Sequence, residues 1–380
     1  MDVKSKAYQE LLKKRPLNVQ ARFANEEMGL VSGRDIAAAA KKCDSIVLAA
    51  NARHPLVVKG VLRAAKKKNA AVLIELAKSE STYCGSTYDN LADYALKYST
   101  ELGHGAVFGL HVDHYAIKSE ADVLKGVGHL TKILNSGFTS VAIDASHLED
   151  YDNFAATRAL AGWLPPELGL EVEVGEIKGP GELSTVEEAT YYIGGLNAWQ
   201  IFPDYLAISN GSLHGTYDPA VGQMEGIDLT RTKEIADAIA PYGVAIAQHG
   251  ISGTPLDKVS TFRKYGIRKG NVATLFQNVY FGIKMDPDTG NAITEGGTYT
   301  KEADRGISVE LWEKIVAAAD EKGMSRKSGD YKKLNLPFAE MILNEPQPII
   351  DRIVDEIEWW AGRFIDAFGA EGTADAGAEI

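Results

Sequence analysis

Short runs of β-branched and other apolar residues alternate along this chain with longer segments whose apolar residues recur at helical spacing. We expect strands over residues 45–50, 71–76, 107–113, 139–144, 170–175, 205–210, 244–249 and 270–275. Helices are expected over 55–68, 87–102, 119–136, 153–163, 229–240 and 255–265. Ser184 opens the sequence Ser-Thr-Val-Glu, which fits a capping box at the start of a further helix. Strands that alternate with helices are typical of a parallel sheet built from βα units.

Eight such strands predict an α/β protein, and the favoured architecture is a closed (β/α)8 TIM barrel. A doubly wound open sheet is the alternative, but no G-x-G-x-x-G sequence follows a strand, which disfavours a dinucleotide-binding version. Residues 1–44 are expected to form helical segments at the bottom of the barrel, and 347–368 a C-terminal helical extension. We expect one domain over 1–368, with an insertion at 285–346, and a disordered tail over 369–380.

Composition and charge exclude several classes of protein. The chain has 380 residues, of which 45% are hydrophobic and 24% charged, as in soluble globular proteins. Its formal net charge of −12, without a basic stripe, argues against a nucleic-acid partner. Cys43 and Cys84 form no C-x-x-C pair, which indicates a reducing compartment and no zinc–thiolate site. With no signal peptide or spanning apolar run, the expectation is a cytoplasmic protein with no membrane association.

Acidic and histidine residues recur at the ends of the expected strands, where barrel enzymes place their chemistry. The candidate residues are Asp113, His114, Glu173, His214 and His249. Imidazole and carboxylate groups are good ligands for zinc and similar divalent ions, and catalytic zinc usually has three protein ligands and one open position. His114, His214 and His249 therefore predict a metal site that Glu173 could join, unless each histidine only hydrogen-bonds in a polar rim. His111, which shares a strand face with Asp113, is expected to be packed and hydrogen-bonded.

Glycine-rich junctions follow the last three expected strands. Their candidate residues are Gly215, Gly250, Ser252, Gly253, Asn271 and Thr274. The loops after strands seven and eight form the recurrent phosphate site of this barrel, where backbone N–H groups and hydroxyls hold the anion. Ser252 and Thr274 would supply the hydroxyls. The alternative is that the glycines only make tight turns.

Six segments together resemble the class II fructose-bisphosphate aldolase family, in the same order along residues 45–280. They are HVDH (111–114), SVAIDASHL (140–148), LEVEVGEI (170–177), SLHGTY (212–217), QHGISG (248–253) and NVAT (271–274). The resemblance implies a barrel aldolase that reversibly cleaves fructose 1,6-bisphosphate to dihydroxyacetone phosphate and glyceraldehyde 3-phosphate. It also implies a homo-oligomer, either a dimer or a tetramer.

The resemblance also implies residue roles. His114, His214, His249 and Glu173 would bind Zn²⁺ or another divalent ion, with a monovalent cation as a further candidate. Asp113 would transfer a proton at the aldehyde-derived oxygen, and Glu182 would take the proton from the substrate carbon, with Glu176 as the competing carboxylate. Asn271 would hydrogen-bond the enediolate. The phosphate would be held by Gly215, Gly250, Ser252, Gly253 and Thr274.

The chain departs from the family pattern on the phosphate side. Asp218 stands in place of a lysine, Ile251 in place of the second glycine of HGGSG, and Leu275 in place of a frequent acidic residue. We expect another cation, Lys78 or Lys269, to reach the phosphate; otherwise the preferred substrate lacks that phosphate.

Three other functions fit parts of the pattern. The nearest is an aldolase of the same type acting on tagatose bisphosphate or a phosphorylated deoxy-keto acid. A barrel metallohydrolase would carry an H-x-H pair on its first strand, and the first expected strand, SIVLAA, has none. A non-catalytic barrel serving as a partner subunit would have no need of the three histidines together with Asp113.

Overall fold

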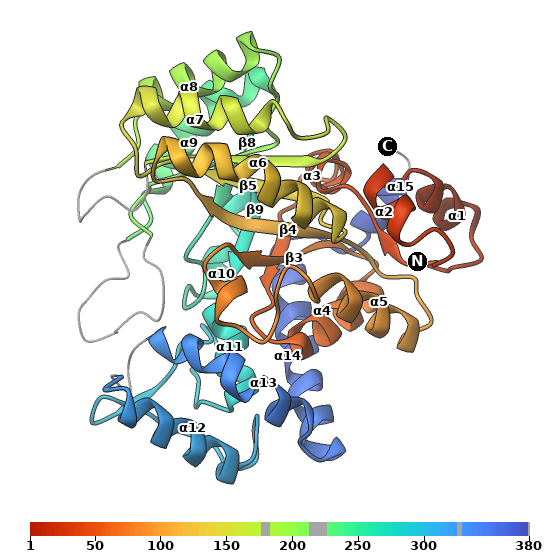
Figure 1. The fold of residues 1–380 in the computed structure, drawn as a ribbon, viewed down its shortest axis with the longest axis vertical. Helices are drawn as coiled ribbons and strands as arrows, with labels where there is room; N and C mark the ends of the chain where they lie inside the picture. Colours follow the sequence, from red (N-terminus) through yellow and green to blue (C-terminus); the bar gives the residue numbers. More distant parts are fainter. Residues whose placement is uncertain (176–182, 213–225, 325–328, 379–380) are drawn as a thin grey trace.

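The structure, a computed structural model, describes residues 1–175, 183–212, 226–324 and 329–378. Eight parallel strands form a closed barrel, in which β9 pairs with β2 and β4 pairs with β5 (Figure 1). They are β2 (Val47–Asn51), β3 (Ala71–Ala77), β4 (Val107–Ala116), β5 (Ser140–Asp144), β6 (Gly169–Val174), β7 (Tyr205–Ile208), β8 (Ala245–Gln248) and β9 (Ile267–Val272). The predicted (β/α)8 barrel is confirmed, and the open-sheet alternative is wrong because the sheet closes on itself.

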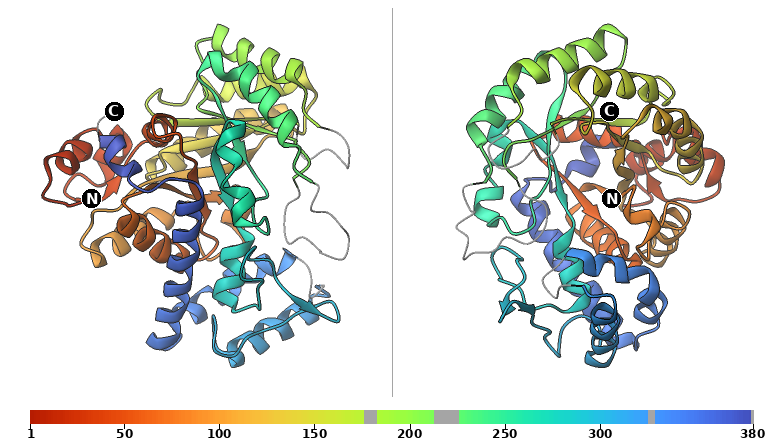
Figure 2. Two further views of the ribbon diagram at one scale, coloured as in Figure 1. Left: turned by 180° about the vertical axis from the view of Figure 1, so that it is seen from behind. Right: turned by 60° about the vertical axis from the view of Figure 1, so that its left-hand side comes forward.

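Helices connect the strands around the outside of the barrel (Figure 2). They are α4 (Pro55–Lys68), α5 (Leu91–Glu101), α6 (Glu120–Asn135), α7 (Asp150–Ala161), α8 (Val186–Ala198), α9 (Leu229–Ile239), α10 (Leu256–Val259) and α11 (Thr274–Phe281). Short 3₁₀ turns accompany them: η1 (Glu80–Thr82), η4 (Ala240–Tyr242) and η5 (Phe262–Tyr265). None of the helices in the described ranges has the length and apolar character needed to cross a membrane.

Segments before and after the barrel complete the molecule. The chain begins with α1 (Lys6–Lys13), α2 (Leu17–Arg22), the short strand β1 (Gly29–Leu30) and α3 (Gly33–Lys42). After the barrel come the hairpin β10 (Thr294–Glu295) and β11 (Thr298–Tyr299), then α12 (Val309–Glu321), η6 (Gly329–Leu334), α13 (Asn335–Leu343), α14 (Gln347–Ala367) and α15 (Thr373–Ala378). Helix α14 packs closely on α4 because Gly60 has no side chain, where a Cβ would lie 2.5 Å from Ile357 Cγ2.

Several predicted boundaries differ from the structure. The helix expected over 87–102 begins at Leu91, and the one expected over 255–265 is divided into α10 and η5. The eighth strand ends at Val272, because Thr274 already begins α11 and the apolar run continues into that helix. The capping box of α8 uses Thr185 and Glu188. Ser184 is instead fully buried, where its hydroxyl donates to Val174 O at 3.1 Å and accepts from Ser209 N at 3.0 Å.

The prediction of a disordered tail is wrong for the residues up to 378, because Thr373–Ala378 form helix α15. Helix α15 lies against α1 and α3, close to where the chain begins (Figure 1). Thr373 Oγ1 accepts a hydrogen bond from Ala71 N at 3.0 Å, and Ala374 is buried among Tyr8, Ile36 and Val47. The small residues that suggested disorder allow this helix to pack closely under the barrel.

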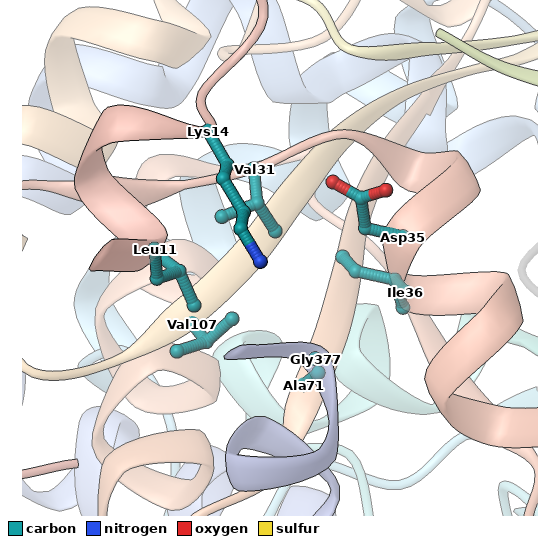
Figure 3. Close-up of a pocket in the computed structure, with 8 residues that line it drawn as sticks. All are labelled: Leu11, Lys14, Val31, Asp35, Ile36, Ala71, Val107 and Gly377. Atoms are coloured by element: carbon teal, nitrogen blue, oxygen red, sulfur yellow. The ribbon is translucent and has the colours of Figure 1, made fainter. Parts of the chain in front are cut away.

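A small cavity lies at this amino-terminal end of the barrel. Leu11, Val31, Ile36, Ala71, Val107 and Gly377 line it together with two charged residues. The side chains of Lys14 and Asp35 face each other across it (Figure 3), and burial raises the pKa of Asp35. The cavity lies at the opposite end from the carboxyl ends of the strands, so we assign it no catalytic role.

The interior of the barrel changes from apolar to polar along the strands. Val47, Ala49, Ala71, Leu73 and Val107 form one apolar cluster near the amino ends. Farther along the same strand faces lie buried polar side chains: Asn51, Glu75, His111, Glu171 and Lys269. Since alternate residues of a strand share a face, this change directs charged groups toward the carboxyl end of the barrel.

Candidate active site

Buried acidic and histidine side chains meet at the carboxyl end of the barrel. They are Asp113 and His114 on β4, Asp144 at the end of β5, Glu171 and Glu173 on β6, and His249 after β8. All of them are at least 90% buried except His114, whose side chain is 28% exposed. Four separate strands therefore contribute to one group of side chains.

An irregularity in β4 brings two consecutive residues to this site. In a regular strand, Asp113 and His114 would point to opposite faces of the sheet. The pairing of β4 with β5 shifts between Val112 and Tyr115, and His114 has a left-handed backbone, with φ of 41°. Such a bulge re-aims the side chain. One potential ligand atom from each of Asp113, His114 and His249 lies within 4.8 Å of the others.

The geometry fits a divalent metal ion. His114 Nδ1 lies 3.0 Å from Glu173 Oε1 and 3.3 Å from Asp144 Oδ2, and the rings of His114 and His249 are 4.5 Å apart at their centroids. Glu171, Glu173 and His249 form a further group of the same size. Imidazole and carboxylate donors are the ligands that zinc and related ions take in enzymes.

The predicted metal residues His114, His249 and Glu173 are thus brought together. The third predicted histidine, His214, lies outside the described residues.

The local charges also favour a cation. Burial raises the pKa of Glu173 to about 7, and the nearby Asp144 carboxylate adds to the shift. Burial opposes ionisation of Asp144 as well, but hydrogen bonds from His114 and Ser146 lower its pKa to about 2. Burial alone would lower the pKa of His114, yet the carboxylates of Glu173 and Asp113 raise it well above its usual value. Two imidazoles here face several carboxylates, which is a suitable environment for a metal cation.

A second group of ionic side chains lies deeper in the barrel. Lys269 Nζ lies 2.7 Å from Glu171 Oε2, 3.4 Å from Glu75 Oε2 and 3.2 Å from His111 Nε2. Lys269 is fully buried, so the expectation that it reaches a substrate phosphate is wrong. His111 is packed and hydrogen-bonded as predicted, since its Nδ1 lies 2.8 Å from Ser140 Oγ and burial lowers its pKa to about 3.

Asn271 connects the two groups. Its Nδ2 donates to Asp113 Oδ1 at 3.2 Å and to Glu75 Oε2 at 3.1 Å. Glu75 was not among the sequence candidates. Its signal in the sequence is an acidic residue inside the otherwise apolar strand AVLIELA, which only a polar barrel interior explains.

The loops after β8 and β9 keep the features of an anion site. Gly250 and Gly253 have left-handed backbones, with φ of 68° and 91°, and Ser252 between them is 8% exposed. Thr274 is the first residue of α11, and Ala273 before it provides no side-chain cap. Ile251, at the altered HGGSG position, is fully buried in the apolar cluster outside the barrel.

The structure describes one more residue that was considered for the substrate phosphate, Lys78. Lys78 lies at the β3–β4 side of the barrel, where its Nζ donates to Ala116 O at 2.7 Å and lies 4.2 Å from the centre of the Tyr115 ring. Glu182, Glu176, Gly215 and Asp218 lie outside the described residues.

Fold and site together define a (β/α)8-barrel protein with a cluster of histidine and carboxylate side chains suited to a metal ion. The model of the family described as fructose-bisphosphate aldolase class-II matches residues 31–322. The chain therefore belongs to the class-II fructose-bisphosphate aldolase family, and as a member of it is an aldolase.

Curated relatives agree with this assignment. A fructose-bisphosphate aldolase of Streptococcus pyogenes is 28% identical over 258 residues, which cover 65% of this chain and 80% of the relative. A fructose-bisphosphate aldolase of Streptococcus pneumoniae is 27% identical over 258 residues, which also cover 65% of this chain and 80% of the relative.

Solved structures share the fold. The YdjI aldolase of Escherichia coli is similar with a TM-score of 0.59 at 16% identity, over 91% of this chain and 99% of that one. The fructose-bisphosphate aldolase of Campylobacter jejuni has a TM-score of 0.59 at 16% identity, over 91% and 97% of the two chains.

Proposed function

We propose that this protein is a metal-dependent aldolase that reversibly cleaves fructose 1,6-bisphosphate to dihydroxyacetone phosphate and glyceraldehyde 3-phosphate. One observation carries the proposal: ligand atoms of Asp113, His114 and His249 lie within 4.8 Å of one another at the mouth of a barrel of this family, and Glu173 lies beside His114. A carboxylate next to a metal cluster is the arrangement that carbon–carbon cleavage needs, because one group must accept a proton while another stabilises charge.

The metal would be held by His114, His249 and Glu173, together with His214 as the third histidine. A bound divalent ion, with Zn²⁺ as the expected one, would act as a Lewis acid toward the substrate carbonyl. Glu173 is buried, and its Oε1 lies 3.0 Å from His114 Nδ1. Both observations support its place in this ligand set.

Asp113 would act as the base in the cleavage direction. Its carboxylate would take the proton of the hydroxyl on the carbon that becomes the aldehyde, and the carbon–carbon electron pair would move to the ketone-side carbon. Burial works against ionisation of Asp113, but nearby His114 and His249 lower its pKa, and Asn271 fixes one of its oxygens. Glu182, or Glu176 in its place, would return a proton to the ketone-side carbon.

The substrate phosphate would lie at the loops after β8 and β9. The left-handed glycines Gly250 and Gly253, the Ser252 hydroxyl and the first amides of α11 at Thr274 support this location. Gly215 would contribute from the loop after β7.

An aldolase of the same mechanism acting on another ketose phosphate, such as tagatose bisphosphate, is the second candidate. The substitution of Asp218 for the family lysine favours a change of substrate, and in particular a ketose that lacks the phosphate at that end, because a carboxylate repels a phosphate.

A cleavage assay over a panel of sugars tests both candidates. The panel would hold fructose 1,6-bisphosphate, tagatose 1,6-bisphosphate, fructose 1-phosphate and unphosphorylated fructose, each with untreated, chelated and metal-restored protein. We expect cleavage that chelation abolishes and metal restores. Full activity without metal, or trapping of a substrate imine by borohydride, would contradict the proposal. We further propose a cytoplasmic homodimer or tetramer, which light scattering after size-exclusion chromatography would test.

A further inference from the structure

The ionic group inside the barrel is joined to the metal cluster through one carboxylate. Glu171 is fully buried, and its two oxygens have different partners. Oε1 lies 3.0 Å from His249 Nε2, and Oε2 lies 2.7 Å from Lys269 Nζ. Both oxygens of Glu171 are thereby engaged, so the carboxylate cannot rotate without breaking one of these contacts.

We propose that Lys269 and Glu171 are positioning residues for the metal site: the Lys269–Glu171 ion pair fixes the carboxylate against Nε2 of His249 and so leaves Nδ1 of His249 to bind the metal. This inference rests on the proposed function in one respect, the role of His249 as a ligand.

The chemistry of imidazole gives the reason. A neutral imidazole carries its proton on one nitrogen and its lone pair on the other, and only the lone pair binds a metal. A carboxylate that faces one nitrogen favours the proton on that nitrogen and fixes the orientation of the ring. It also makes the lone pair of the other nitrogen a better ligand for a metal. Glu171 lies at Nε2 of His249, so it selects the tautomer with the lone pair on Nδ1.

Glu171 itself is a poor candidate for a ligand, although it lies within the Glu171, Glu173 and His249 group. An ammonium 2.7 Å from Oε2 already balances its charge and would repel a second cation nearby. Glu173, whose Oε1 lies beside His114 instead, has no such lysine among its described contacts.

Lys269 is held in place by further buried groups. Glu75 Oε2 lies 3.4 Å from Lys269 Nζ, and His111 Nε2 lies 3.2 Å from it. His111 is anchored in turn by Ser140 at 2.8 Å. These contacts hold the ammonium group of Lys269 beside Glu171 Oε2.

The test compares three variants of the full chain: Glu171→Gln, Lys269→Met and the double variant Lys269→Met with Glu171→Gln. Metal-free protein would be titrated with Zn²⁺ and Co²⁺, the visible spectrum of bound Co²⁺ would report the coordination, and melting of the metal-free form would report stability. Asp204→Asn is the matched control. Asp204 is a buried carboxylate in the barrel wall, but it contacts Leu170 N and Arg34 at the amino end of the strands.

We expect each single variant to weaken Zn²⁺ binding by about 10- to 100-fold and to alter the Co²⁺ spectrum. The double variant removes both buried charges, so its melting temperature should recover toward the wild-type value. Its metal affinity should stay low, because the glutamine is no longer anchored by a lysine. Asp204→Asn should lower the melting temperature and leave metal affinity unchanged.

Four results would contradict the inference, the proposed function or both. Wild-type metal affinity in the double variant would overturn the inference alone, since the ionic group would then only fill the barrel. A higher KM for phosphorylated ketoses in Lys269→Met, with metal affinity unchanged, would also overturn it. Metal binding by the wild type without cleavage of any ketose phosphate would overturn the proposed function alone, whereas no metal binding would overturn both.

Discussion

Asp113 and His114 are neighbours in the chain, and yet both side chains face the mouth of the barrel. Strand β4 shifts its pairing between Val112 and Tyr115, and His114 adopts a φ of 41°. The shift places a potential ligand atom of each residue within 4.8 Å of one from His249. One strand thereby supplies both a candidate base and a candidate metal ligand.

Replacement of the proposed ligands should remove the metal. His114→Ala and His249→Ala should each weaken metal binding by more than about 100-fold, because a lost ligand costs more than a lost supporting contact. Metal content per chain by atomic emission, with cleavage rates, would measure this. His104→Asn serves as control, since His104 has a left-handed backbone that asparagine tolerates and hydrogen-bonds Ser99 instead. Stoichiometric metal in both alanine variants would disprove this ligand set.

The two functions of β4 should separate by mutation. Asp113→Asn preserves shape and keeps an oxygen for Asn271, but it cannot accept the proton. We expect the metal to remain bound and kcat to fall by about 100- to 10,000-fold, as removal of a general base does. A variant that cleaves at the wild-type rate would show that another group takes the hydroxyl proton.

The loop after β6 should carry the second proton-transfer group. Glu182→Ala should slow exchange of the ketone-side proton of dihydroxyacetone phosphate with solvent by about 100-fold or more. Exchange would be followed by NMR in deuterium oxide, with Glu176→Ala as the matched variant. The opposite result, normal exchange in Glu182→Ala and slow exchange in Glu176→Ala, would transfer the role to Glu176.

His54 should make the protein sensitive to acid. It is fully buried, its Nδ1 accepts from Leu56 N at 3.3 Å at the start of α4, and burial lowers its pKa from 6.5 to about 4. The unfolded chain binds this proton more readily, so the stabilising contribution is complete above pH 6.5 and is lost as pH falls toward 4. The loss should reach on the order of 3 kcal/mol.

Urea unfolding of wild type and His54→Asn between pH 4 and 7 would measure this contribution. Asparagine keeps a capping oxygen but does not titrate, so the variant should lose less stability over this range. Parallel pH profiles for the two proteins would mean that His54 does not cause the acid sensitivity.

Helix α15 should stabilise the amino-terminal end of the barrel. Removal of residues 372–380 would leave Ala71 N without the Thr373 hydroxyl and expose the surface that Ala374 covers, with a loss of about 2 kcal/mol. Removal of 379–380 alone, which keeps α15 whole, is the control. Equal melting temperatures for the two truncated proteins would show that α15 does not stabilise the fold.

The sequence by itself determined the elements and most of the candidate chemistry. Strand and helix periods are local properties, so α4 was predicted residue for residue and each of the eight barrel strands was found. Asp113, His114 and His249 were also recognisable, because they follow apolar runs at positions where a barrel exposes side chains. The breaks between elements were less certain, since Val272 and Leu275 continue one apolar run across the end of β9.

Closure of the barrel decided the rest. Lys269 was expected at a phosphate because Asp218 replaces the family lysine and another cation was needed there, but it lies in the interior between acids from two other strands. Glu75 lies beside Asn271 because β3 and β9 flank β2 in the closed barrel. The polar tail forms a helix because Thr373 accepts a hydrogen bond from Ala71 N and because Ala374 packs in the same apolar cluster as Tyr8. These contacts join residues far apart in the chain, and no local pattern of hydrophobic and polar positions encodes them.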